Sequence, residues 1–563
     1  MSPTLKRTSR GALGHAYAGE FPSFERSFRP KDEILRCNGN QRPRLLIKQV
    51  DFNLGLKWCL MLDRTSADGD PVSSGLPELD SILAGGYAFN RIHLIEGQPG
   101  CGKTTLALQF LLAGARQGIK TLYITLSETR DELRHVARTH GWSLDGIELF
   151  ELVPPELSLD PGREQSIVYS SDLELGETVQ MVMDEVVKAK PAFVVFDSLS
   201  EIRLLAQNPL RYRRQVLALK HFFFKKACTV LFLDDLTSES EDFNLHSLAH
   251  GVVRLEQLAA VYGAEKRRLR VYKMRGRAFR GGFHDYVIRK GGLSVFPRLV
   301  ASEHHRDFDD AKAVPTGVLQ LDAMLGGGLE RGTSLLLLGP SGAGKSSLAQ
   351  QFVHSLLQQK ERCLFVSFDE TERTFRKRAT GMGMEFGPHL QSGELTFLQI
   401  DPAERSPGEL TGLLRHNVEE REVRTVVLDS LNGYQNAMSE EQYMLLQMHE
   451  LLTYLNQQGV ITILVVAQHG LVGPMQTAID LTYLSDSVLL LRFFEAAGDV
   501  RRAISMLKKR TGGHESKIRE YRIDSGGVRV GNVLSEFQGV LSGVPVFAGK
   551  NSQLLEDRHG TGA

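Results

Sequence analysis

Two glycine-rich segments of this chain, at positions 97–104 and 339–346, fit the pattern GxxxxGK[ST]. In this pattern the backbone N–H groups of the loop surround phosphate oxygens, the lysine reaches the β- and γ-phosphates, and the final hydroxyl binds Mg²⁺. Each segment follows an apolar run and precedes a helical pattern, which is the context that the loop requires. The sequence therefore predicts two sites for a nucleoside triphosphate with Mg²⁺. The predicted phosphate ligands are Gly97, Gly100, Gly102, Lys103, Thr104 and Thr105 in the first site, and Gly339, Gly342, Gly344, Lys345, Ser346 and Ser347 in the second.

An aspartate that ends an apolar strand accompanies each loop. Asp197 and Asp429 both precede Ser-Leu, and a carboxylate in this place can orient a metal ion and its water shell. We predict that Thr104 and Asp197 bind Mg²⁺ at the first site, and that Ser346 and Asp429 bind it at the second. The alternative interpretation is that each aspartate caps the helix that follows it.

A carboxylate also stands at the end of another predicted strand in each half of the chain. Glu128 occupies this place in the first half, and Asp369 and Glu370 occupy it in the second. A carboxylate here can polarise an attacking water or accept a hydroxyl proton, so we predict that all three residues are catalytic. The alternative is that this segment only caps the next helix, a role that Thr129 or Thr371 could also fill.

Late in each half, a predicted strand ends in Lys-x-Arg. The pairs are Lys273 with Arg275 and Lys508 with Arg510. Because side chains two positions apart on a strand share a face, both cations of a pair can point at one place and neutralise a transferring phosphoryl group. The alternative is a solvated strand at the edge of a sheet, where lysine is common.

The elements that must position these residues occur twice. A spacing of 242 positions separates Lys103 from Lys345, and the same spacing separates SGLPELD at 74–80 from TGVLQLD at 316–322. Short apolar runs alternate with helix-length segments in both halves, which predicts α/β modules with mostly parallel sheets covered on both faces. The predicted strands lie at 91–95, 121–125, 192–196 and 229–233, and at 334–338, 364–368, 425–428 and 461–465.

Composition excludes several classes of protein. The 563 residues carry 67 Lys and Arg against 67 Asp and Glu, so bulk charge does not favour binding to nucleic acid. The longest apolar stretches fall far short of the roughly 20 residues that span a bilayer. Five scattered cysteines without a CxxC pair indicate neither a disulfide framework nor a zinc site. We expect a soluble protein in the reducing cytoplasm.

The repeats predict five segments. Two ATPase domains are expected at 66–298 and 314–546, joined by a polar linker at 299–313. A basic N-terminal extension at 1–65 is expected to be poorly ordered, and a short tail follows at 547–563. The extension is either a regulatory or targeting arm, or a leader without a function of its own.

The chain from Ser66 to Val546 resembles the KaiC family of RecA-like ATPases. The resemblance rests on the two glycine-rich loops, on the repeated SGLPELD/TGVLQLD string, and on the pairs SETRDEL/DETERTF, FDSLS/LDSLN and KMRG/KKRTG. It implies two tandem RecA-like P-loop domains that bind ATP and Mg²⁺ in a homohexamer, with the nucleotide between neighbouring subunits. It further implies that the Lys-x-Arg pairs reach across to the neighbour's nucleotide. Family members hydrolyse ATP in the first ring and phosphorylate their own Ser/Thr in the second.

The sequence departs from the family pattern in places that bear on this activity. The family has paired glutamates after the second strand, and Ser127 and Asp369 replace the first of each pair. Thr482 matches the first of two adjacent phosphoacceptors, whereas Tyr483 replaces the second. A single-site switch at Thr482 remains open, and so does a purely structural role for its hydroxyl. Gln468 resembles a sensor of the γ-phosphate that the first half lacks.

Three functions are compatible with these residues. The preferred one is an ATP-hydrolysing signalling protein with Ser/Thr autokinase activity in the second domain, passing its state to an unidentified protein partner. A RecA-like ATPase acting on DNA is the first alternative, but the acidic segment 238–242 stands where a basic and aromatic loop would bind nucleic acid. A nucleotide-stabilised scaffold with little turnover is the second alternative, and Ser127 favours it.

Overall fold

The computed structural model of the chain describes residues 69–152, 171–236, 243–259, 263–309, 313–436, 441–468, 481–496, 498–541 and 546–547. The predicted extension at 1–65, the acidic segment 238–242 and all but the first residue of the predicted tail lie outside the described residues. No helix among the described residues is long and apolar enough to cross a membrane.

Nine strands of the first half of the chain form one sheet, which defines what we call the first domain. They are β1 (Ile92–Gly97), β2 (Thr121–Thr125), β3 (Ile147–Glu151), β4 (Phe193–Asp197), β5 (Thr229–Asp235), β6 (Gly251–Leu258), β7 (Lys266–Met274), β8 (Phe283–Arg289) and β9 (Gly292–Phe296). Their order in the sheet is β3-β2-β4-β5-β1-β6-β7-β8-β9. The strands from β3 to β6 in this order pair in parallel, and the last three continue the sheet antiparallel.

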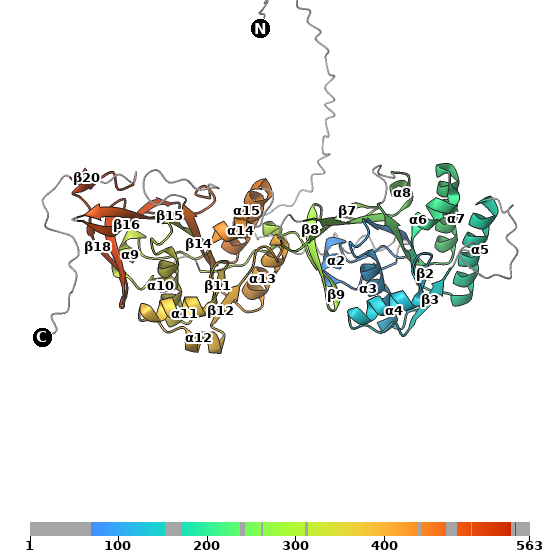
Figure 1. Cartoon of the computed structure of the whole chain (residues 1–563), viewed down its shortest axis with the longest axis horizontal. Coiled ribbons are helices and arrows are strands. Elements are labelled where there is room, and N and C mark those ends of the chain that lie inside the picture. The colour runs from blue at the N-terminus through green and yellow to red at the C-terminus, as the bar shows by residue number, and fades with distance from the viewer. Residues whose placement is uncertain are drawn as a thin grey trace, which may run out of the picture. The chain divides into compact units, whose positions relative to one another are not determined.

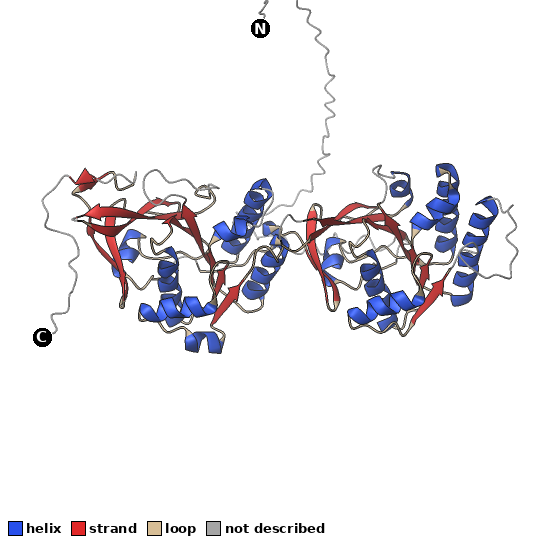
Figure 2. Cartoon of the chain, viewed as in Figure 1, coloured by secondary structure: helices blue, strands red, loops and turns tan. Residues whose placement is uncertain are grey.

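Helices cover both faces of this sheet (Figures 1 and 2). They are α2 (Pro77–Ile82), α3 (Lys103–Arg116), α4 (Arg130–Thr139), α5 (Ser171–Ala189), α6 (Leu199–Ala206), α7 (Pro209–Lys225) and α8 (Phe243–Leu248). The first three pack in one apolar cluster and the last four in a second cluster on the other face. Because both faces are covered, β1 is buried along its whole length.

The second domain repeats this architecture with nine further strands. They are β10 (Ser334–Pro340), β11 (Cys363–Ser367), β12 (Leu395–Gln399), β13 (Thr425–Asp429), β14 (Ile461–Gln468), β15 (Ser487–Ala496), β16 (Asp499–Lys509), β17 (Ile518–Asp524) and β18 (Gly527–Val533). Their order, β12-β11-β13-β14-β10-β15-β16-β17-β18, matches that of the first domain strand for strand. The predicted α/β fold, with two tandem RecA-like domains and mostly parallel sheets, is therefore confirmed.

The helices of the second domain are again divided between two apolar clusters on the two faces of its sheet. They are α9 (Leu319–Met324), α10 (Lys345–Gln358), α11 (Glu372–Gly381), α12 (Gly387–Ser392), α13 (Pro407–Glu419), α14 (Leu431–Asn436) and α15 (Glu441–Gln457). A 3₁₀ turn at Ala301–Glu303 precedes this domain, and a two-stranded ribbon of β19 (Phe537–Gln538) and β20 (Val546–Phe547) follows it.

The turn from the central strand into the next helix requires glycine in both domains. Gly102 and Gly344 precede α3 and α10 with φ of 98°, a left-handed conformation that side chains rarely adopt. A Cβ on Gly102 would also lie 2.5 Å from Cδ1 of Ile288, and one on Gly344 would lie 2.3 Å from Cδ1 of Ile523. The antiparallel strands β8 and β17 thus press on the phosphate loops, a contact that the sequence pattern did not predict.

Candidate ATP-binding sites

The first glycine-rich segment forms the loop between β1 and α3. Lys103 is buried, and its Nζ donates hydrogen bonds to the carbonyl oxygens of Gly97 (2.9 Å) and Gln98 (3.1 Å). The same Nζ lies 2.7 Å from Oδ1 of Asp235 at the end of β5. Protein oxygen atoms therefore hold the ammonium group of Lys103 over its own loop. The oxygens of a bound phosphate would replace them as hydrogen-bond acceptors.

The second loop, between β10 and α10, is built in the same way but lacks the extra carboxylate. Lys345 Nζ donates to the carbonyl oxygens of Gly339 (3.0 Å) and Pro340 (2.8 Å). Burial lowers the pKa of Lys345 to about 8, although the charge of Asp429 acts in the opposite direction. Both loops offer the first N–H groups of a helix to an anion, so the residues present fit a bound nucleotide.

The aspartates predicted to bind Mg²⁺ lie beside the hydroxyls predicted with them. Asp429 interacts with the side chain of Ser346, and burial raises the pKa of Asp429 to about 6. Burial likewise raises the pKa of Asp197 to about 6, against the effect of hydrogen bonds from Tyr123 and Thr104. Neither aspartate directly precedes a helix, since Ser198 stands at the N-cap of α6 and Ser430 separates Asp429 from α14, which begins at Leu431.

No group of three or more His, Cys, Asp or Glu side chains could hold a metal among the described residues. Mg²⁺ at phosphate sites needs fewer ligands from the protein. One carboxylate and one hydroxyl suffice there, because phosphate oxygens and waters complete the octahedron. One carboxylate beside one hydroxyl therefore fits Mg²⁺ that is bound together with a nucleotide.

Tyr123 on β2 holds the aspartate of the first site and was missed by the sequence analysis. Its hydroxyl donates a hydrogen bond of 2.5 Å to Oδ2 of Asp197, and both side chains are buried. The equivalent residue on β11 of the second domain is Phe365, so only the first domain has this bond. A tyrosine inside an otherwise apolar strand is the only signal of it in the sequence.

We expect Tyr123→Phe to lower the stability of the nucleotide-free protein by about 1–3 kcal/mol, because Asp197 loses a donor in a buried place. Mg²⁺ with ADP should then raise the melting temperature of the variant more than that of the natural protein, because the metal ion satisfies the freed oxygen. Differential scanning fluorimetry with and without Mg²⁺ and ADP measures both effects.

Tyr87→Phe is the matched control, because within the described part of the chain no hydrogen-bond partner reaches the buried hydroxyl of Tyr87. Equal melting temperatures for Tyr123→Phe and Tyr87→Phe would contradict the assigned role of Tyr123.

Glu128 lies just past the end of β2, in a loop tied to that strand. Its backbone N–H donates to Oγ1 of Thr125 (2.9 Å), and the Thr125 hydroxyl donates to the Glu128 carbonyl (2.8 Å). Thr129 is the residue that caps α4, through a capping box with Glu132, so the glutamate is free of that task. Within the described residues no hydrogen-bond partner reaches the buried Oε2 of Glu128.

The surroundings of Glu128 favour its protonated form. Burial, and then the charges of Asp197, Glu132 and Asp235, raise the pKa of Glu128 to about 7. A carboxylate whose pKa lies near neutral pH is suited to take a proton from water.

The matching carboxylates of the second domain have different partners. The Glu370 backbone N–H donates to Oγ of Ser367 (3.0 Å), which repeats the tether of the first domain. Its side chain, however, forms an ion pair with Arg378 of α11 (Nη1 to Oε1, 2.5 Å). Asp369 accepts a hydrogen bond from Ser430 (2.7 Å), the residue after Asp429. The sequence analysis missed Arg378, which stands in a helix with three other cations.

The sheet register settles where the predicted γ-phosphate sensor lies. Gln468 stands level with Pro340 on the neighbouring strand, at the mouth of the second loop. In the first domain Asp235 stands level with Gly97, whose equivalent Gly339 is one residue before Pro340. Asp235 forms an ion pair with Lys103 of the loop.

The Lys-x-Arg pairs lie at the opposite end of the sheet from their own phosphate loops. Lys273 is paired with Val252 of β6, and Val252 is paired with Leu94 in the first half of β1. The phosphate loop, by contrast, follows the last residue of β1. The second pair occupies the same place, with Lys508 level with Val488 of β15. β7 and β16 lie inside the strand order, but β8 and β17 pair only with residues 267–270 and 502–505. Each Lys-x-Arg pair therefore stands where its strand has one neighbour, and the alternative of a solvated edge stays open.

Each Lys-x-Arg pair contacts the backbone that leads into the preceding strand. Lys273 and Arg275 donate to carbonyl oxygens of residues 246–249, and Lys508 donates to those of Thr482 and Ser485, both at 2.7 Å. Arg510 donates to the carbonyl of Tyr483. The predicted phosphoacceptor Thr482 is half-buried, and it shares the sheet end of the second pair.

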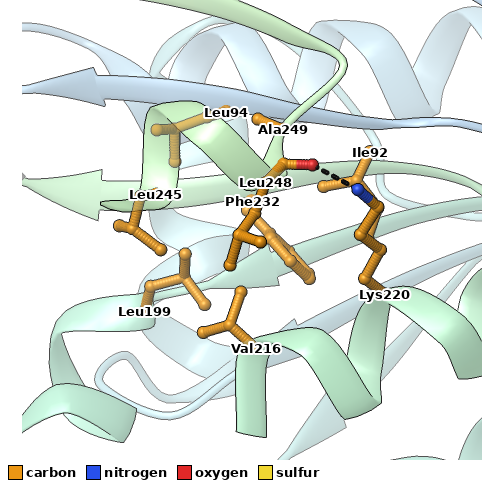
Figure 3. A pocket seen from close by; sticks show the side chains of 9 residues that line it. All are labelled: Ile92, Leu94, Leu199, Val216, Lys220, Phe232, Leu245, Leu248 and Ala249. Carbon is orange, nitrogen blue, oxygen red and sulfur yellow. Dashed lines mark hydrogen bonds between the residues drawn. The ribbon is translucent and has the colours of Figure 1, made fainter. Parts of the chain in front are cut away.

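A small cavity in the first domain lies between the sheet and α7 and α8 (Figure 3). Its volume is about 10 Å³, room for about one water molecule. Apolar side chains line it, apart from Lys220, whose Nζ donates to the carbonyl of Leu248 (2.7 Å). It is too small for a substrate.

Comparison with known proteins agrees with the geometry. The sequence model of the family described as "ATPase: KaiC" matches residues 72–300 and again residues 314–535. The chain is 26% identical over 497 residues to circadian clock protein KaiC3 of Synechocystis, an alignment that covers 87% of this chain and 97% of that protein. It is 24% identical to circadian clock oscillator protein KaiC of Picosynechococcus, over 83% of this chain and 90% of that protein.

Proposed function

Because the chain belongs to the KaiC family of ATPases, we propose that it binds ATP with Mg²⁺ at both phosphate loops and hydrolyses it. The observation that carries the proposal is that each domain places three groups at one end of its sheet. These are a loop lysine, an aspartate beside a loop hydroxyl, and a tethered glutamate. A cytoplasmic location is part of the proposal, since Cys101, Cys228 and Cys363 are free thiols.

Each residue has a definite part in the proposed reaction. Lys103 and Lys345 neutralise the β- and γ-phosphates, and the hydroxyls of Thr104 and Ser346 hold Mg²⁺, which supplies charge compensation when bound. Glu128 takes a proton from the attacking water, and Glu370 does so once its ion pair opens.

The proposed assembly is a homo-oligomer, a hexamer as the family resemblance implies, with ATP between neighbouring subunits. The support is geometric. Lys273 and Lys508 lie at the end of the sheet opposite to their own loops, so they serve a nucleotide only if it belongs to another subunit. Native mass spectrometry with and without ATP tests the assembly, and a monomer in both conditions would contradict it.

We propose further that the second domain phosphorylates Thr482 and that a protein partner reads this state. Thr482 precedes β15, whereas the second loop follows β10, which runs parallel to β15. A strand of seven residues spans about 20 Å, so the phosphate must come from the ATP of another subunit. Phosphate at this place would add about −1.5 to −2 charges.

The expected result with γ-labelled ATP and Mg²⁺ is protein-bound label that maps to Thr482. In a mixture of Thr482→Ala with Lys345→Ala protein, the label should appear on the Lys345→Ala chains, because their Thr482 lies beside the neighbour's working site. Glu370→Gln protein alone should take up no label. Absence of label on the natural protein would remove the kinase part of the proposal and leave an ATPase.

The alternative of a nucleotide-stabilised scaffold keeps one specific observation in its favour, the ion pair that occupies Glu370. Phosphate release from ATP distinguishes the two functions, since a scaffold binds the nucleotide without steady release.

A further inference from the structure

The equivalent glutamates of the two domains, Glu128 and Glu370, have different contacts. Glu370 is paired with Arg378, whereas the residue equivalent to Arg378 on α4 is Val136, 242 positions earlier. Glu128 consequently has no arginine at this helix position, and its Oε2 is buried without a hydrogen-bond partner in the described part of the chain.

Arg378 is held in place by a buried amide and is not a mobile surface side chain. Its Nε donates to Oε1 of Gln350 (3.0 Å), and Nε2 of Gln350 donates to the carbonyl of Phe375 (2.9 Å). Gln350 is fully buried on α10, the helix that begins at the phosphate loop. In the first domain Leu108 takes the place of Gln350, so the arginine and its support are both specific to the second domain.

The ion pair opposes proton transfer because it occupies one oxygen of Glu370, so this oxygen must leave Arg378 before it can take a proton from water. The side chains of Arg378 and Glu370 are 22% and 30% exposed, so solvent screens the pair only in part.

The pair is not needed to hold the loop that carries Glu370. The hydroxyl at the end of the preceding strand tethers this loop in both domains, at 3.0 Å in the second and 2.9 Å in the first. Removal of the arginine should therefore release the carboxylate without moving the backbone around it.

We infer that Arg378 is a positioning residue that restrains Glu370 and keeps ATP hydrolysis in the second domain slow. The inference rests on the proposed role of Glu370 as proton acceptor. It predicts that turnover differs between the domains because of one helix position, where the second domain has an arginine and the first a valine.

The test uses the full chain with one domain silenced. In a Glu128→Gln background, where only the second domain turns over, Arg378→Val is expected to raise kcat about tenfold. Arg378→Lys should stay close to the parent protein, because it keeps the charge. The affinity for a fluorescent ATP analogue should be equal in all three proteins, since Arg378 acts on the base and not on the nucleotide.

The reciprocal exchange is made in a Glu370→Gln background, where only the first domain turns over. Val136→Arg with Leu108→Gln is expected to lower kcat, so the two exchanges should have opposite signs. General damage to the fold would lower both rates, and melting temperatures report such damage independently.

Each remaining outcome is decisive. A lower or unchanged kcat in Arg378→Val, with turnover present and ATP affinity equal, would overturn the inference alone. No turnover in the second domain of either protein would overturn the proposed hydrolysis there, and the inference with it. Turnover that appears only in Arg378→Val would support both.

Discussion

Glu128→Gln is expected to lower ATP turnover in the first domain by about 10²–10⁴-fold, the usual contribution of a general base. The amide keeps the size of the side chain but cannot take a proton. The backbone tether to Thr125 does not involve the side chain, so the loop should stay in place. Phosphate release, measured in a Glu370→Gln background that silences the second domain, reports the first domain alone.

Glu148→Gln is the matched control, because Glu148 is an exposed residue on β3 of the same domain. Its turnover should equal that of the parent. A Glu128→Gln protein with parental turnover would show that another group takes the proton.

The pH dependence of the first domain follows from the same residue. Burial and neighbouring carboxylates raise the pKa of Glu128 to about 7, and only the deprotonated form accepts a proton. Turnover should therefore rise with pH through about 7, and this rise should be absent from the residual activity of Glu128→Gln.

Lys103→Ala and Lys345→Ala are expected to weaken ATP binding at their own sites by about 10²–10⁴-fold. The estimate assumes two hydrogen bonds from the ammonium group to phosphate oxygens, at about 1.5–3 kcal/mol each. The loss should be larger for Lys103→Ala, because Asp235 would then face the phosphates with its charge uncompensated. Titration with a fluorescent ATP analogue, with the other site already disabled, measures each affinity.

The second site should also bind ATP less tightly as pH rises above about 8. The pKa of Lys345 is lowered to about 8, so the free site loses its positive charge above that pH and must take up a proton to bind phosphate. Lys377→Ala removes an exposed cation from the same domain and should leave the affinity unchanged. Equal affinities for Lys377→Ala and Lys345→Ala would refute the assigned role of the loop lysine.

The sequence was most informative where local chemistry determines local structure. Both loops, the strands before them and the helices after them follow from glycine, lysine and apolar runs within a few positions of one another, and the structure confirms these elements. Only three-dimensional contacts showed whether the carboxylates at the strand ends cap the following helices. Thr129 and Thr371 cap the helices, and Asp197 bonds to Tyr123 instead.

Partners far apart in the sequence could not be predicted from the pattern. The ion pair of Lys103 with Asp235 joins positions that lie on neighbouring strands only after the sheet has formed. The antiparallel strands β8 and β17 were not expected, although they press on the phosphate loops. Arg378 is one cation among several on its helix, and only its distance to Glu370 sets it apart.

Both large sheets are closed within their own domains: among the described residues, all of their strand pairings join strands of the same domain. The separate pairing of the two sheets has a consequence for folding during synthesis on the ribosome. The first sheet can form as soon as β9 has emerged, and at about 5–20 residues per second the second domain needs roughly another 10–50 s. During that interval the first domain must hold its fold alone, whereas the second is never without a folded neighbour on the same chain. ATP that binds the first loop would stabilise the nascent chain by mass action before synthesis ends.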